Sequence, residues 1–249
     1  MTAARREVLV TGGGRGIGRA IALRFAEDGA RVFVNFFVNR EAAEKTARDV
    51  ELRGGSAHLL QADLKEPLEI RKMIAEIERV TDRLDVLVNN AASGVLRSAL
   101  EVSAKQWDWV LNTNVRPLLL CVQATLHLMR PGARVVSLSS LGSGRVIPGY
   151  AAIGVSKAAL EALTRYLAAE LAPRGIAVNA VAAGAVETDV WRAIPNGDAA
   201  LEQIRARTPA GNLVSAEAVA EAVAFLAGPA AGAIHGHVLV VDGGYSILA

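Results

Sequence analysis

Short runs of apolar, often β-branched residues alternate along this chain with longer stretches in which apolar positions repeat with a helical period. The short runs are almost continuously hydrophobic, which is typical of strands in a parallel sheet that is covered on both faces. They predict strands at residues 7–10, 31–35, 57–61, 86–89, 134–139, 177–181 and 238–241. The longer stretches predict helices at residues 18–27, 40–52, 68–80, 107–129, 156–171 and 216–227.

Strand and helix alternate from one end of the chain to the other, which indicates right-handed βαβ units. We therefore predict an α/β fold with a single Rossmann-type, doubly wound parallel sheet and helices on both faces. The length of 249 residues suits one domain over residues 1–249. The long irregular stretch 184–214 would follow the carboxyl end of a strand, where such folds bind ligands. We predict that it is a substrate lid.

Composition narrows the possible functions. Hydrophobic residues make up 52% of the chain, and the net charge of +2 is too small to indicate a nucleic-acid surface. No apolar run is long enough to span a membrane and no signal peptide is visible, so a cytoplasmic protein is expected. Cys121 lies in an apolar stretch and is expected to be buried. The four histidines do not cluster with acids or with this cysteine, so no metal site is expected.

A glycine-rich turn, T-G-G-G-R-G-I-G at residues 11–18, connects the first strand to the first helix. The first glycine permits a tight turn, the next lets the backbone approach a pyrophosphate, and the last lets helix and strand pack closely. The free N–H groups and dipole of the helix N-terminus favour the phosphates. We assign to the dinucleotide site the residues Gly12, Arg15, Gly16, Ile17 and Gly18.

The region after the second strand indicates which dinucleotide binds. NAD enzymes place an acid there to bond the adenosine ribose, but no carboxylate occurs in residues 34–40. Arg15 stands in the glycine turn and Arg40 opens the next helix, and either cation suits a 2′-phosphate. Each arginine is equally compatible with a solvated surface position. The missing acid is the stronger argument, and it favours NADPH.

The glycine spacing resembles the T-G-x-x-x-G-x-G turn of the short-chain dehydrogenase/reductase family, and further motifs extend the resemblance over essentially the whole chain. It implies that Asp63 caps the adenine and that Asn89, in N-N-A-A at residues 89–92, belongs to the cofactor site. It also implies that Asn114 helps to hold an active-site water and lysine network. Thr188 matches the threonine that bonds the nicotinamide carboxamide.

The catalytic residues of this family are a serine, a tyrosine and a lysine four residues after the tyrosine. The tyrosine protonates the substrate oxygen, and the lysine lowers the pKa of the tyrosine and bonds the nicotinamide ribose. Here the lysine is Lys157, which also belongs to the cofactor site, but Ile153 stands where the tyrosine is expected. The nearest tyrosine is Tyr150. Ser140, at the family's serine position, either bonds the thioester oxygen or caps the strand end.

A tyrosine seven residues before the lysine would share one helix face with it, because seven residues make almost two turns. The three-residue displacement moves the hydroxyl by about 4.5 Å along the axis. In conjugate reduction of an enoyl thioester, hydride reaches the β carbon, two atoms from the carbon that bears the oxygen. The acid that stabilises the enolate oxygen must then stand farther from the nicotinamide. Tyr150 therefore favours reduction of a carbon–carbon double bond.

This tyrosine spacing resembles that of enoyl-acyl-carrier-protein reductases, and the intact glycine turn resembles the Bacillus-type enoyl-acyl-carrier-protein reductase III group. The T-P-A-G segment at residues 208–211 matches the lid of that group. The resemblance implies an NADPH enzyme of bacterial fatty acid synthesis whose substrate is an acyl-carrier-protein or CoA thioester. It also implies a homotetramer paired through helices 107–129 and 156–171. Trp107 and Trp109 are expected to pack in the core or between subunits.

Two other functions remain open. The protein could reduce 3-oxoacyl thioesters or other carbonyls, with Tyr150 reaching the usual place through a distorted helix start. It could instead bind dinucleotide without catalysis, since Ile153 removes the expected acid. The retention of Lys157, Asn114 and Thr188 argues against a non-catalytic protein.

Overall fold

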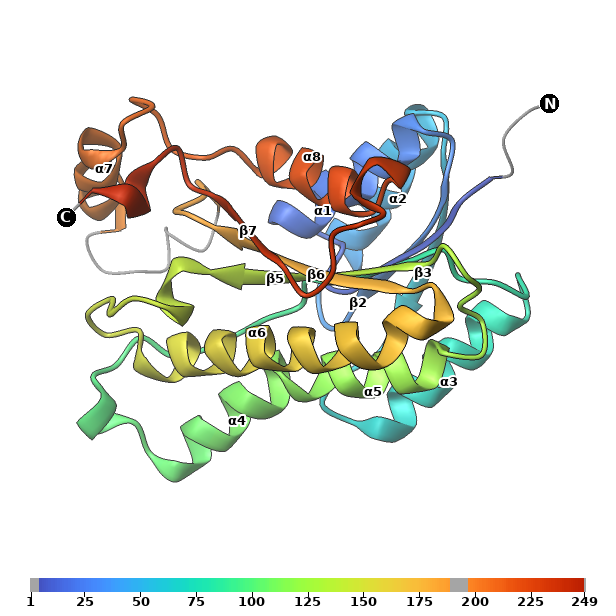
Figure 1. Ribbon diagram of the computed structural model, residues 1–249, viewed down its shortest axis with the longest axis horizontal. Coiled ribbons are helices and arrows are strands. Elements are labelled where there is room, and N and C mark those ends of the chain that lie inside the picture. Colours follow the sequence, from blue (N-terminus) through green and yellow to red (C-terminus); the bar gives the residue numbers. More distant parts are fainter. Residues whose placement is uncertain (1–4, 189–196, 249) are drawn as a thin grey trace.

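A seven-stranded parallel sheet forms the centre of the molecule, in a computed structural model that describes residues 5–188 and 197–248 (Figure 1). The strand order is β3-β2-β1-β4-β5-β6-β7. The strands are β1 Glu7–Val10, β2 Arg31–Phe36, β3 Ser56–Gln61, β4 Val86–Asn89, β5 Arg134–Ser140, β6 Ala177–Ala183 and β7 Val238–Val241. The predicted Rossmann-type fold is confirmed.

The direction of winding reverses between β1 and β4. Val8 pairs with Val32 of β2 on one side and with Val86 of β4 on the other. The connections that follow β1 and β4 therefore diverge at the carboxyl ends of these two strands. A crevice for a ligand forms at such a switch point.

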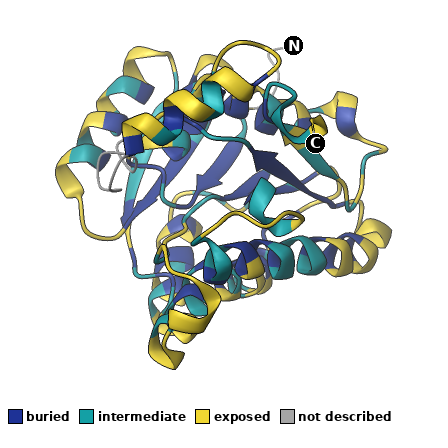
Figure 2. Ribbon diagram, turned by 90° about the vertical axis from the view of Figure 1, so that its left-hand side faces the viewer, coloured by how far each residue is buried: buried dark blue, intermediate teal, exposed yellow. Residues whose placement is uncertain are grey.

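Helices cover both faces of the sheet. They are α1 Gly16–Glu27, α2 Arg40–Leu52, α3 Pro67–Glu78, α4 Ala104–Asn114, α5 Arg116–Thr125, α6 Ala151–Leu171, α7 Gly197–Arg207 and α8 Ala216–Leu226. One face carries α1, α2 and α8, and the other carries α3, α4, α5 and α6 (Figure 1). Figure 2 shows the strands buried between these layers, while the helices expose their outer sides. In the described part of the chain, no helix is long and apolar enough to cross a membrane.

Three helix predictions differ from the structure. The helix expected at 107–129 is divided into α4 and α5, because Pro117 lies in the first turn of α5 and proline cannot continue a helix from the preceding turn. Helix α6 begins at Ala151, earlier than the expected 156. Helix α7 lies within the stretch that was expected to be irregular. Its described buried residues are only Gly197 and Leu201, so it lacks the apolar stripe that reveals a helix in sequence.

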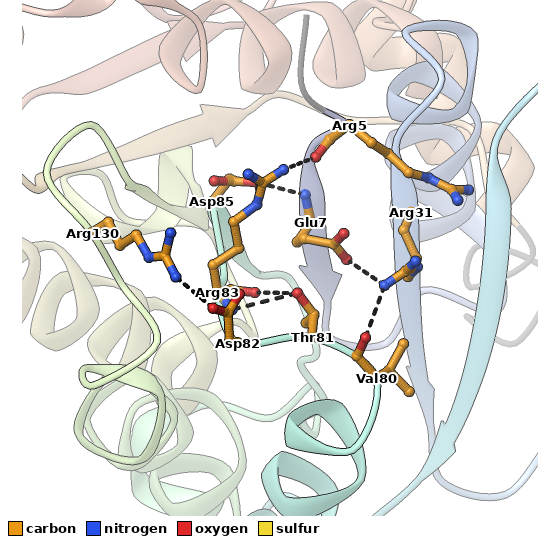
Figure 3. A network of polar contacts seen from close by, with 9 residues as sticks. All are labelled: Arg5, Glu7, Arg31, Val80, Thr81, Asp82, Arg83, Asp85 and Arg130. Atoms are coloured by element: carbon orange, nitrogen blue, oxygen red, sulfur yellow. Dashed lines mark hydrogen bonds and ion pairs between the residues drawn. The ribbon is translucent and has the colours of Figure 1, made fainter.

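The amino ends of the central strands are joined by a polar network (Figure 3). The backbone N–H of Glu7 donates to the carboxylate of Asp85 at 2.7 Å, and the guanidinium of Arg31 lies 3.4 Å from the Glu7 carboxylate. Arg83 donates to the carbonyl of Arg5. Burial raises the pKa of Glu7, and the charge of Arg31 acts in the opposite direction. The network lies at the edge of the sheet away from the carboxyl ends, so its role is structural.

Candidate active site

A cleft of about 770 Å³ opens at the carboxyl ends of β1 and β4. Its walls come from the glycine turn, from the segments that follow β2, β3 and β4, and from α4. The predicted cofactor residues that line it are Gly12, Arg15, Gly16, Ile17, Gly18, Asp63 and Thr188. The structure thus brings together, in one cleft, most of the residues assigned to the dinucleotide.

Backbone conformation or crowding disfavours side chains at Gly12, Gly16 and Gly18 of the glycine turn. Gly12 and Gly16 adopt φ values of 61° and 55°, in the left-handed region that favours glycine. A Cβ on Gly18 would lie 2.3 Å from the Gly12 carbonyl oxygen and 2.5 Å from the side-chain nitrogen of Asn90. No side chain caps the N-terminus of α1 at Arg15, so first-turn N–H groups remain available to an anion. The turn therefore fits the pyrophosphate of a dinucleotide.

Asn90 holds this turn in place, although the sequence favoured its neighbour Asn89. The Asn90 side chain donates to the carbonyls of Thr11, at 2.8 Å, and Gly12, at 3.1 Å. The hydroxyl of Thr11 accepts from the Asn90 backbone N–H at 2.9 Å. Asn90 lines the cleft, whereas Asn89 is not among its lining residues and is 2% exposed. The difference follows from the strand end: β4 still includes position 89, so position 90 is the first to leave the sheet.

The two arginines predicted to meet a 2′-phosphate have different surroundings. Arg15 is exposed at the cleft, and within the described residues its guanidinium has no hydrogen bond or ion pair. Arg40 donates to the side chain of Gln61 at 2.9 Å, lies over the ring of Phe36, and is not among the lining residues. Lys65, which sequence reasoning missed, lines the cleft. Its ammonium lies 3.1 Å from Asp63.

Tyr150 lies just outside α6, as the residue that precedes the first turn, with φ −108° and ψ 13°. Ideal helix geometry therefore begins only one residue after Tyr150, and the shared face of Tyr150 and Lys157 stays a prediction. The Tyr150 ring lies against the turn that follows β5 at Ser140. Burial raises the pKa of Tyr150, and interaction with the Ser140 side chain acts in the opposite direction. Ser140 also accepts from the backbone N–H of Gly142 at 3.2 Å, so it both caps the turn after β5 and contacts the tyrosine.

Lys157 is buried in α6 below the end of β5. Its ammonium donates to the carbonyl of Leu138 at 2.7 Å. Burial lowers the pKa of Lys157 to about 8, while the carboxylate of Glu161 acts to raise it. Glu161, which sequence reasoning missed, accepts from the hydroxyl of Ser139 at 2.5 Å. In the described part of the chain no hydrogen bond joins Lys157 directly to Tyr150.

Asn114 connects the loop after β4 to α6. It is fully buried at the end of α4, where its side-chain oxygen Oδ1 accepts a hydrogen bond from the backbone N–H of Ser93 at 2.8 Å. Its amide donates to the hydroxyl of Ser156 at 2.9 Å. Asn114 therefore contacts Ser156, the residue that precedes Lys157, and has no hydrogen bond with the lysine itself within the described residues. Trp109, expected to serve only in packing, lines the cleft from the same helix.

The two ends of the predicted lid, residues 184–214, lie side by side, because Val186 and Val214 form a parallel bridge. Thr188 lines the cleft at the start of this segment, and residues 189–196 lie outside the described residues. The T-P-A-G segment at 208–211 contacts the C-terminal part of the chain, where the Ala210 N–H donates to the Gly243 carbonyl at 3.0 Å. Among the described residues, no group of three or more His, Cys, Asp or Glu could hold a metal ion.

The chain is similar in sequence and in structure to known reductases and dehydrogenases. The family model described as Enoyl-(Acyl carrier protein) reductase matches residues 12–246. A 1-cyclohexenylcarbonyl-CoA reductase of Streptomyces collinus is 40% identical, over 100% of this chain and 90% of its own. A 3-oxoacyl-[acyl-carrier-protein] reductase FabG of Staphylococcus aureus is 37% identical, over 96% of this chain and 97% of its own. A solved short chain dehydrogenase of Burkholderia cenocepacia in complex with NADP has a TM-score of 0.89 and 37% identity, covering 97% of this chain and 98% of that one.

Proposed function

The chain belongs to the short-chain dehydrogenase/reductase family, and we propose that it reduces the carbon–carbon double bond of enoyl thioesters with NADPH. The observation that carries this proposal is the position of the acid. Tyr150 directly precedes α6 with its ring against the turn after β5, and Ile153 occupies the place of the usual acid. The name of the Streptomyces relative describes a double bond conjugated to a CoA thioester, which supports the same chemistry.

NADPH held at the glycine turn would supply the hydride that the proposed reaction adds to the β carbon of the substrate. Tyr150 donates a hydrogen bond to the thioester oxygen, where negative charge develops, and Ser140 orients the tyrosine hydroxyl. The family resemblance assigns support of this acid to Lys157, whose buried ammonium is held by the Leu138 carbonyl. A proton from solvent completes the saturated product. Thr188 and the glycine turn hold the cofactor.

Reduction of 3-oxoacyl thioesters is the second candidate. It is supported by the FabG relatives and by Ser140, which stands where carbonyl reductases keep their serine. The finer resemblance to enoyl-acyl-carrier-protein reductase III, the choice between acyl-carrier-protein and CoA carriers, and the homotetramer stay predictions.

The two candidate functions separate in one assay. NADPH oxidation should be followed by the loss of its absorbance, with crotonyl-CoA and acetoacetyl-CoA supplied to the same purified protein at equal concentrations. We expect kcat/KM for crotonyl-CoA to exceed that for acetoacetyl-CoA by about tenfold or more. If the protein turns over acetoacetyl-CoA and not crotonyl-CoA, the proposed enoyl reduction is wrong and carbonyl reduction is the function.

Cofactor choice gives a further prediction. NADPH should bind more tightly than NADH, because residues 34–40 contain no carboxylate and, among the described residues, no hydrogen bond or ion pair engages the guanidinium of Arg15. Arg15→Ala should weaken NADPH binding by roughly 1–3 kcal/mol and leave NADH binding almost unchanged, as measured by fluorescence titration. Arg40→Ala is the matched control, and it should change the preference less because Arg40 is already bonded to Gln61. Equal affinity of the wild type for both cofactors would contradict the prediction.

A further inference from the structure

Three glycines surround Tyr150 and the first turn of α6: Gly94, Gly142 and Gly154. None of them is among the glycines with positive φ, so none is required by its backbone conformation. Each instead lies in close contact with another part of the site. Their lack of a side chain therefore serves the packing of their neighbours.

Gly142 lies against the ring of the proposed acid. A Cβ at this position would lie 2.6 Å from Cδ1 and 2.7 Å from Cε1 of Tyr150. The same turn touches α6, since a Cβ on Gly154 would lie 2.6 Å from the Gly142 carbonyl oxygen. The carbonyl of Tyr150 accepts from the Gly154 N–H at 2.7 Å, which fixes the start of the helix. The ring is thus confined between the turn after β5 and the first turn of α6.

Gly94 lies in similar close contact with Ile153, the residue at the position of the usual acid. A Cβ on Gly94 would lie 2.3 Å from Cγ1 and 2.6 Å from Cδ1 of Ile153, but 3.7 Å from its Cβ. The loop that carries Gly94 continues to Arg97, whose backbone forms a parallel bridge with Tyr150. One loop therefore contacts both Ile153 and Tyr150, and it holds the first turn of α6 in a single register.

We propose that Gly142 and Gly94 are positioning residues that determine where the acid of this site stands. Gly142 determines the position of the Tyr150 ring. Gly94 leaves space for Ile153, so that the first turn of α6 carries an apolar side chain three residues after Tyr150. The proposal rests on the proposed function, in which Tyr150 is the acid.

The first test is Gly142→Ala, measured with whichever thioester the wild type reduces. We expect kcat to fall about tenfold or more, with the NADPH dissociation constant changed less than about twofold, because overpacking displaces the ring and not the glycine turn. Gly144→Ala is the matched control. It lies in the same loop and has no positive φ, and an added Cβ would meet nothing within 4 Å, so its kcat should stay within about twofold of wild type.

A double-mutant cycle separates positioning from general damage. In a Tyr150→Phe background, Gly142→Ala should cost little further activity, because the hydroxyl that it misplaces is already gone. An equal loss of kcat in both backgrounds would overturn the proposal. A large loss from Tyr150→Phe with none from Gly142→Ala would overturn it while leaving the proposed function intact. No loss from Tyr150→Phe would instead reject the proposed function, and this inference with it.

The second glycine is tested by rescue, which does not depend on the Gly142 variant folding. Gly94→Ala should lower kcat, because the added methyl group meets Cγ1 and Cδ1 of Ile153. The pair Gly94→Ala with Ile153→Ala removes those two atoms and should restore most of the lost activity. A Gly94→Ala loss that Ile153→Ala does not relieve would contradict the role of this contact.

Discussion

Replacing Tyr150 by phenylalanine is expected to lower kcat with an enoyl thioester by about a hundredfold or more, since one oxyanion donor contributes roughly 2.7–4 kcal/mol. The substitution removes only the hydroxyl and leaves the ring packed against Gly142. The loss should appear in kcat more than in KM, because the bond strengthens as charge develops on the oxygen. Steady-state kinetics with crotonyl-CoA measure both constants.

The NADPH dissociation constant of the Tyr150→Phe variant is the internal control, and it should stay close to that of the wild type. A relocated acid provides the comparison. Ile153→Tyr together with Tyr150→Phe restores the spacing of a carbonyl reductase, and it should not recover enoyl reduction. Near-normal enoyl turnover by Tyr150→Phe alone would exclude this tyrosine as the acid.

Replacing Lys157 by alanine is expected to damage both cofactor binding and turnover. The buried ammonium is held by the Leu138 carbonyl. Loss of a group that takes part in acid–base catalysis typically lowers the rate by about a hundredfold or more. The affinity for NADPH should fall as well, because the family places this lysine against the nicotinamide ribose. Fluorescence titration and kcat measured on one preparation distinguish this double effect from the single effect of Tyr150→Phe.

The charge of Lys157 should also appear in the pH profile. With a pKa of about 8, the side chain is cationic at lower pH and neutral at higher pH. The kcat/KM of the wild type should therefore fall as pH rises through this value. Lys157→Met, which has similar length without charge, should lose activity as Lys157→Ala does and should lack this descending limb. Near-normal turnover by the methionine variant would show that the lysine acts through packing alone.

The sequence predicted the parts of the protein whose cause is local. The continuous apolar runs identified the strands, because a strand covered on both faces needs no polar side. The glycines of residues 11–18 identified the phosphate turn, since a positive φ at Gly12 and close packing at Gly18 both exclude side chains. The replacement of an acid by Ile153 was visible for the same reason, because it is a matter of spacing along one chain segment.

The tertiary structure decided what depends on contacts between distant segments. It showed that Asn90, and not Asn89, holds the glycine turn by hydrogen bonds. The reason is that β4 ends at Asn89, so Asn90 is the first residue outside the sheet. The structure placed Tyr150 directly before the first turn of α6. It also revealed the contacts of Gly94 and Gly142. Spacing in sequence gives no such information, since the distance between two side chains on different elements is determined by how those elements pack.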